Sequence, residues 1–127
     1  MSDKKRILIV EDEVAILRAT SDRLTDEDYE MIEAKDGRAG LDLALKEHPD
    51  LILLDILMPK MDGVQVMKKL REDSWGKNVP VILLTKLDLD DQKLREIVQY
   101  GAAYYLVKRD WSLEDVVKKV KEVLIKQ

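Results

Sequence analysis

The sequence predicts an α/β fold, a (βα)5 unit in which a five-stranded parallel sheet is doubly wound with helices on both faces. Five short apolar runs recur along the 127 residues, and each is followed by a segment with helical spacing. Runs that are apolar throughout are typical of strands buried on both faces, as in parallel sheets. Because strand and helix alternate five times without a linker, we expect a single domain over residues 1–127.

The apolar runs give the predicted strands. They are Ile7–Val10, Tyr29–Ala34, Leu51–Leu54, Val81–Leu84 and Tyr104–Val107. The second run contains two glutamates, which a strand buried on both faces does not tolerate. We therefore place this strand at the edge of the sheet.

Each intervening segment has the apolar stripe of a helix, and most have an end signal. The first, at about Val14–Thr25, has the weakest stripe, the second stops before Pro49, and the fourth stops at Gly101. Ser112 and Asp115 resemble a capping box at the start of the fifth. The other stripes are Leu41, Ala44 and Leu45; Val64, Met67 and Leu70; Leu94, Ile97 and Val98; and Val116, Val120, Val123 and Leu124.

Composition excludes several classes of protein. The 22 Lys and Arg against 26 Asp and Glu give a net charge of −4, which a general nucleic-acid or anionic-membrane binder would not have. The absence of cysteine excludes disulfides and thiolate chemistry, and a single histidine excludes a multi-histidine zinc centre. No apolar run approaches the roughly 20 residues of a membrane span, and the N-terminus lacks a signal-peptide pattern. We therefore expect a cytoplasmic protein.

Polar residues follow four predicted strands, at the sheet edge where doubly wound folds bind ligands. Glu11 and Asp12 follow the first strand, Asp55 the third, Thr85 the fourth and Lys108 the fifth. If the first and third strands are neighbours, their ends lie about 4.8 Å apart and three carboxylates share one pocket. A hard divalent cation neutralises such a cluster, so we expect Mg²⁺ as the cofactor.

Taken alone, each of these residues has a plainer interpretation. The acids Glu11-Asp12-Glu13 favour a helix N-terminus, Thr85 fits a strand-end hydroxyl, and Lys108 fits a surface lysine. Asp55 has no such capping role, because Pro59 blocks an immediate entry into a helix. Their joint occurrence at four strand ends is what indicates a site.

The segment DILMPKMDG, residues 55–63, closely resembles the phosphoacceptor segment of bacterial response-regulator receiver domains. The resemblance covers nearly the whole chain and implies the flavodoxin-like strand order 2-1-3-4-5. An ordered set of residues carries it at receiver-like spacing: Glu11, Asp12, Asp36-Gly37, Asp55, Thr85, Gly101-Ala102, Tyr105 and Lys108.

The resemblance implies roles for the acidic residues. Asp55 would accept a phosphoryl group from a histidine kinase or a phosphotransfer protein. Glu11, Asp12 and Asp55 would hold Mg²⁺ together with the backbone carbonyl of Leu57.

It also implies a switch. Thr85 and Lys108 would contact the phosphoryl oxygens, and Tyr105 would reorient together with Thr85. An unknown downstream protein would read this change on the face formed by the fourth helix, the fifth strand and the fifth helix. We expect that face to be bordered by Leu87, Tyr104 and Arg109–Trp111.

Two positions depart from the receiver pattern. Lys86 follows Thr85 where receivers carry a small side chain, and Arg109 follows Lys108 where they usually carry a proline in a cis bond. We expect Lys86 to cover the mouth of the pocket and, with Leu57, to modulate access of water and small phosphodonors. The plainer alternative is that Lys86 points into solvent and has no effect.

Other conspicuous residues have structural interpretations. His48 falls at a helix C-terminus, where a partly charged imidazole is favourable. Trp75 is a loop residue that covers the rim of the core, and Asp88, Asp90 and Asp91 begin the fourth helix.

We therefore predict a stand-alone, phosphorylation-controlled signalling switch that is not a classical enzyme and binds neither membranes nor nucleic acid directly. The alternative is a phosphorylation-independent interaction module on the same fold. A flavin-binding protein is disfavoured, because Glu11-Asp12-Glu13 would repel phosphate where its phosphate loop should lie. A haloacid-dehalogenase-type phosphatase is disfavoured, because its Asp-x-Asp arrangement after the first strand is absent.

Overall fold

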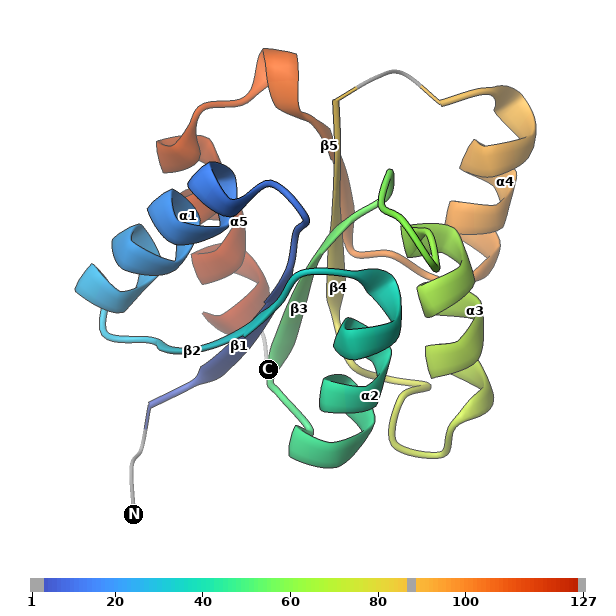
Figure 1. Cartoon of the computed structure of the whole chain (residues 1–127), viewed down its shortest axis with the longest axis horizontal. Coiled ribbons are helices and arrows are strands. Elements are labelled where there is room, and N and C mark those ends of the chain that lie inside the picture. Colours follow the sequence, from blue (N-terminus) through green and yellow to red (C-terminus); the bar gives the residue numbers. More distant parts are fainter. Residues whose placement is uncertain (1–3, 87–88, 126–127) are drawn as a thin grey trace.

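A parallel sheet lies between two layers of helices (Figure 1). The computed structural model describes residues 4–86 and 89–125. The strands are β1 (Arg6–Val10), β2 (Glu30–Ala34), β3 (Leu51–Asp55), β4 (Val81–Thr85) and β5 (Tyr104–Val107). The helices are α1 (Val14–Asp26), α2 (Gly37–Glu47), α3 (Gly63–Glu72), α4 (Asp91–Gln99), the short 3₁₀ helix η1 (Lys108–Asp110) and α5 (Leu113–Ile125).

The strand order is β2-β1-β3-β4-β5, and every neighbouring pair is parallel. This confirms both the fold class and the order implied by the receiver resemblance. β2, whose residues are less buried than those of β1 and β3, lies at the edge as predicted. The order also makes β1 and β4 the two neighbours of β3, so the ends of all three strands lie together.

Successive side chains of each strand enter opposite cores. In β1, Ile7 and Ile9 pack against α1 and α5, whereas Leu8 and Val10 pack against α2, α3 and α4. Both pairs are almost fully buried. This two-sided burial is the physical reason for the continuous apolar runs in the sequence.

Side-chain caps fix where several helices begin. Asp36, Asp62 and Asp90 each accept a hydrogen bond from a backbone N–H three residues later, at 2.8 to 2.9 Å. The predicted capping box of α5 is confirmed, since Ser112 and Asp115 exchange hydrogen bonds of 2.9 and 3.2 Å. Asp91 is the first residue of α4, as predicted, whereas Asp88 and Leu87 lie outside the described residues.

Several element bounds differ from the predictions by one residue. β1 begins at Arg6, and β3 and β4 extend to Asp55 and Thr85. α1 extends one residue past Thr25, and β2 begins one residue after Tyr29. The backbone N–H of Tyr29 donates to the carbonyl of Leu24 at 3.2 Å. Tyr29 therefore still belongs to the turn that closes α1.

The segment between β5 and α5 carries Arg109 where receivers usually have a proline in a cis bond, and here the peptide bond is an ordinary trans one. No cis peptide bond occurs in residues 4–86 and 89–125, so the bond between Lys108 and Arg109 is trans. The backbone N–H of Trp111 donates to the carbonyl of Lys108 at 3.3 Å, and the Trp111 ring packs against the α1–α5 core.

At the opposite end of the molecule, His48 is the C-cap of α2, with φ 50. Its imidazole stacks on the ring of Trp75, with 4.3 Å between centroids and 8° between planes. The Trp75 ring packs on the edge of the α2–α4 core. Both predicted structural roles are confirmed, and the stack joins the end of α2 to the loop after α3.

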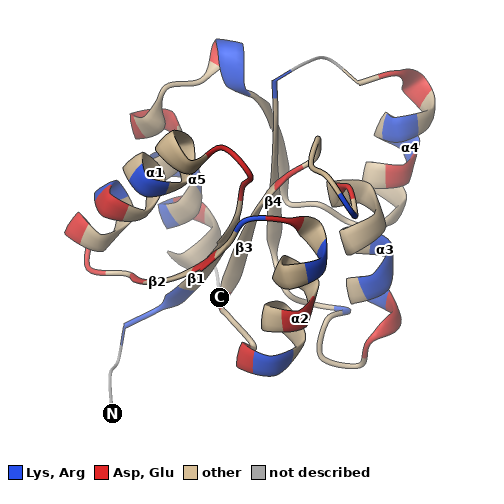
Figure 2. Ribbon diagram, viewed as in Figure 1, with Lys and Arg blue, Asp and Glu red and all other residues tan. Residues whose placement is uncertain are grey.

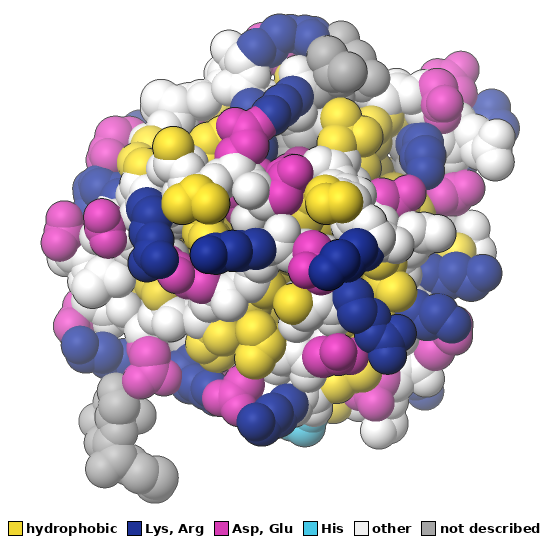
Figure 3. All heavy atoms as spheres, in the orientation of Figure 1, with side chains coloured by type: hydrophobic (Ala, Val, Ile, Leu, Met, Phe, Trp, Pro, Cys, Tyr) yellow, Lys and Arg dark blue, Asp and Glu magenta, His cyan; other side chains and the backbone are white. Residues whose placement is uncertain are grey.

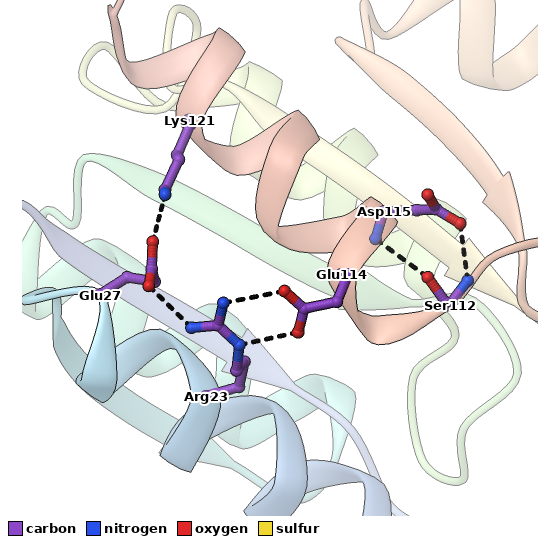
Figure 4. A network of polar contacts seen from close by, with 6 residues as sticks. All are labelled: Arg23, Glu27, Ser112, Glu114, Asp115 and Lys121. Atoms are coloured by element: carbon purple, nitrogen blue, oxygen red, sulfur yellow. Dashed lines mark hydrogen bonds and ion pairs between the residues drawn. The ribbon is translucent and has the colours of Figure 1, made fainter.

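Charged side chains tie α1 to α5 (Figure 4). Arg23 donates two hydrogen bonds of 2.8 Å to Glu114 and one of 2.8 Å to Glu27. Lys121 forms an ion pair with the same Glu27. Such bidentate, multiply bonded ion pairs hold two helices in a defined orientation. None of the described helices has the length and apolarity needed to cross a membrane.

Candidate functional site

The strand register brings acidic side chains together at the carboxyl end of the sheet. Val10 of β1 pairs with Leu54 of β3, so the next residues, Glu11 and Asp55, lie side by side. Asp12 follows in the loop to α1 and is more open to solvent than these two. Carboxylate oxygens of all three acids lie within 4.8 Å of one another. Figure 2 shows these acidic segments at the ends of β1 and β3.

A lysine from the far side of the sheet enters this cluster. Lys108 follows β5, two strands away from β3, and strand spacing alone separates their ends by about 9–10 Å. Its Nζ forms an ion pair with Glu11 and lies 3.8 Å from Oδ2 of Asp55. A shorter side chain at this position could not span that distance.

Asp55 is a buried carboxyl group that lacks the hydrogen bonds such groups ordinarily have. Its side chain is 2% exposed, and within the described part of the chain neither carboxylate oxygen accepts a hydrogen bond. Burial, together with the neighbouring Glu11 carboxyl, raises the pKa of Asp55 well above its usual range, and Lys108 offsets only part of that rise. An additional cation at this position would stabilise the charged form.

The residues Asp62 and Gly63 fix the backbone that follows Asp55. The N–H of Gly63 donates to the carbonyl of Ile56 at 2.9 Å. A Cβ on Gly63 would lie 2.7 Å from the backbone oxygen of Asp55, so only glycine allows this approach. Asp62 then caps α3. Leu57 lies in the loop held in this way, and its side chain is about half exposed.

Thr85 and Tyr105 lie on the β4–β5 side of the cluster. Thr85 is fully buried at the end of β4, one residue beyond the register partner of Asp55. Tyr105 lies on β5, and its hydroxyl accepts a hydrogen bond of 3.2 Å from the N–H of Leu89. The phenol therefore holds the backbone two residues before α4 begins at Asp91.

The structure also pairs Lys86 with a residue that the sequence analysis did not single out as a partner. The Lys86 ammonium forms an ion pair with the carboxylate of Glu13. Around this end of the molecule, acidic and basic side chains lie next to one another with hydrophobic side chains between them (Figure 3). The sequence did contain one indication that Glu13 has another role. Glu13 is a long acid at the N-cap of α1, a position that favours shorter capping residues.

The cluster fits a hard divalent cation. Glu11, Asp12 and Asp55 supply only oxygen ligands, and neither oxygen of Asp55 is taken up by a hydrogen bond within the described residues. Carboxylate oxygens are the ligands that Mg²⁺ prefers in proteins. The residues present therefore could hold such an ion.

The fold and this pocket together define a class, the CheY-like receiver domains of two-component signalling. The model of the family described as "Response regulator receiver domain" matches residues 7–121. The chain belongs to this family, whose domains are signalling switches rather than classical enzymes.

Solved structures support the same assignment. The CheY-like receiver domain protein from Methanospirillum hungatei is 31% identical, with a TM-score of 0.89 over 98% of this chain and 96% of that one. Chemotaxis protein CheY4 of Vibrio cholerae is 34% identical, with a TM-score of 0.86 over 95% and 99% of the two chains.

Curated relatives are longer proteins. Response regulator PleD of Caulobacter vibrioides is 41% identical over 103 residues, which are 81% of this chain and 22% of PleD. The probable transcriptional regulator ycf27 of Porphyra purpurea is 37% identical over 123 residues, which are 97% of this chain and 49% of that protein. The chain thus spans half or less of the length of these relatives.

Proposed function

We propose that the protein accepts a phosphoryl group on Asp55 from a histidine kinase or a phosphotransfer protein, in a reaction that requires Mg²⁺, and thereby changes its binding to a downstream partner. The observation that supports this most directly is the Asp55 side chain itself. It is buried beside Glu11 and Lys108, and within the described structure neither of its oxygens accepts a hydrogen bond. We propose that these residues act as one domain over residues 1–127.

The chemistry that we propose is a displacement at phosphorus. An oxygen of the Asp55 carboxylate attacks the phosphorus of a phosphohistidine, and the P–N bond breaks as the new P–O bond forms. The electron pair of the broken bond stays on the imidazole nitrogen, which takes up a proton. Lys108, 3.8 Å from Asp55, is placed to neutralise charge on the transferring oxygens.

Glu11, Asp12, Asp55 and the backbone carbonyl of Leu57 would hold the metal ion. When bound, Mg²⁺ would offset the repulsion of the carboxylates and the negative charge of the phosphoryl group. Glu11 already pairs with Lys108, so it would act as a second anchor that keeps the lysine pointed at Asp55.

Phosphorylation would reach the output face through Thr85 and Tyr105. Thr85 is buried at the end of the strand next to Asp55, which supports a contact between its hydroxyl and a phosphoryl oxygen. Movement of Thr85 and of the segment after it would alter the hydrogen bond between Leu89 and the Tyr105 hydroxyl. The face read by the partner would be formed by α4, β5 and α5, including Tyr104 and Arg109–Trp111.

The proposal is tested by incubation with Mg²⁺ and acetyl phosphate, followed by measurement of acid-labile phosphate on wild type and on Asp55→Asn. Wild type should be labelled, and the variant, which lacks the nucleophilic oxygen, should not. Beryllofluoride, which mimics the aspartyl phosphate, should then shift the backbone amides of Thr85 and Tyr105. An unlabelled wild type with unchanged amides would instead indicate a phosphorylation-independent interaction module.

A further inference from the structure

Glu13 and Lys86 lie on opposite sides of the phosphoacceptor strand. Glu13 follows the end of β1, Lys86 follows the end of β4, and these two strands flank β3, which ends at Asp55. A contact between the two loops must therefore cross the carboxyl end of β3. The distance to be crossed is two strand spacings, about 9–10 Å, which requires two long side chains.

The two side chains make that contact. The Lys86 ammonium and the Glu13 carboxylate form an ion pair, although their side chains are 51% and 37% exposed. Asp55, at the end of the strand between them, is only 2% exposed. The ion pair is thus at the surface, and the phosphoacceptor is below the surface.

Glu13 is free for this role because it does not cap its own helix. It occupies the N-cap position of α1, where a side chain ordinarily accepts a hydrogen bond from the first turn. The Glu13 side chain makes no such bond. Its backbone N–H instead donates to Oε2 of Glu11 at 3.2 Å, which fixes the loop over the acidic cluster.

We propose that Glu13 and Lys86 form a gate over Asp55 that limits the access of small phosphodonors before transfer and of water afterwards. The inference rests on the proposed function of Asp55 and adds Glu13 as a residue that determines donor specificity. A protein phosphodonor can displace a surface ion pair with its own interface, whereas a small donor or a water molecule reaches Asp55 only when the pair is open. The fraction of molecules in which the ion pair is open therefore sets both the rate of phosphorylation by a small donor and the rate of hydrolysis by water.

A gate and a simple charge effect predict different directions for the rate changes of the two single variants. Glu13→Gln makes the mouth of the pocket more positive and Lys86→Gln makes it more negative. Independent charges would thus change the rate of labelling by anionic acetyl phosphate in opposite directions. A gate is opened by the loss of either partner, so both variants should be labelled faster, and both aspartyl phosphates should hydrolyse faster.

The experiment measures labelling by acetyl phosphate with Mg²⁺ and, after removal of the donor, loss of the aspartyl phosphate. Each single variant should accelerate both steps about two- to fivefold, the factor that opening an exposed ion pair of up to about 1 kcal/mol provides. The double variant should be no faster than the faster single one. Exchange of the two residues, Glu13→Lys with Lys86→Glu, should restore slow rates.

Matched controls are Arg18→Gln and Glu33→Gln. Each control makes the same charge change as one of the test variants and removes one partner of the 3.4 Å ion pair between α1 and β2. That ion pair does not cross the end of β3. The controls should leave both rates unchanged. A second readout needs neither metal nor phosphate: the free energy of unfolding across the Glu13 and Lys86 double-mutant cycle should show favourable coupling.

Three results would overturn the gate. They are opposite rate changes for the two single variants, a double variant faster than both, and unchanged rates in all variants while wild type is labelled. If wild type and every variant remain unlabelled while the protein is folded, the proposed function fails and the gate fails with it.

Discussion

Replacing Asp55 with asparagine should stabilise the metal-free protein. The change keeps the shape of the side chain but removes one negative charge from a buried cluster. Asp55 is repelled by two carboxylates within 4.8 Å and attracted by Lys108 at 3.8 Å. At an effective dielectric constant of about 20, each repulsion is worth at least about 3.5 kcal/mol and the attraction about 4.4 kcal/mol.

The repulsions therefore exceed the attraction by roughly 2–3 kcal/mol before any desolvation cost is added. We expect Asp55→Asn to raise the free energy of unfolding by about 2 kcal/mol, the lower end of that range, because the wild-type carboxyl can relieve part of the repulsion by taking up a proton. With an unfolding entropy of about 2.1 cal/mol/K per residue, this corresponds to a melting temperature higher by about 7 °C for the whole chain.

The assay is thermal and urea unfolding at neutral pH with a chelator present. Asp42→Asn is a suitable control, since this exposed residue of α2 pairs only at the surface with Arg38 and its replacement should change stability by less than about 0.5 kcal/mol. Saturating Mg²⁺ should reduce or reverse the difference between Asp55→Asn and wild type, because the metal binds the native carboxylates. A metal-free Asp55→Asn protein less stable than wild type would refute the electrostatic argument.

Three further predictions concern other parts of the molecule. Mg²⁺ at ten times its dissociation constant should stabilise wild type by about 1.4 kcal/mol, and equal stabilisation of Asp12→Ala would place the metal elsewhere. Phosphorylation should change hydrogen exchange on α4 and β5, including the amide of Tyr105, and an unchanged face would contradict the proposed output. Glu27, whose pKa Lys121 and Arg23 lower to about 2, should stabilise the fold above pH 4.5 and lose that effect as the pH falls toward 2. The urea midpoints of wild type and Glu27→Gln should therefore differ at pH 6 and converge near pH 2, whereas a constant difference would exclude this ion network as its origin.

The sequence predicted the fold and the position of the acidic cluster because both depend on local patterns. A strand buried on two faces must be apolar, so the polar residue that ends it is conspicuous, and parallel strands bring such ends to one edge. Glu11, Asp55 and Lys108 were found in this way, and the structure brings them together.

The contacts that the sequence did not predict join residues through tertiary geometry. Pairing Glu13 with Lys86 requires knowing that β1 and β4 flank the same strand, which no local pattern contains. Arg71 was missed for another reason. Its guanidinium donates to four backbone carbonyls, including those of Tyr100 and Gly101 at 2.6 and 3.2 Å, and backbone acceptors leave no trace in residue identity.

The two helical layers differ in mechanical stiffness. The Arg23 guanidinium, which donates to the carboxylates of Glu114 and Glu27, joins α1 to α5. Each of these helices buries several side chains against the sheet. α4 buries Ile97 alone among its described residues, and Arg71 pins the turn at its C-terminal end. We therefore expect a small displacement at the acidic pocket to move the N-terminal end of α4 more than it moves α1 and α5.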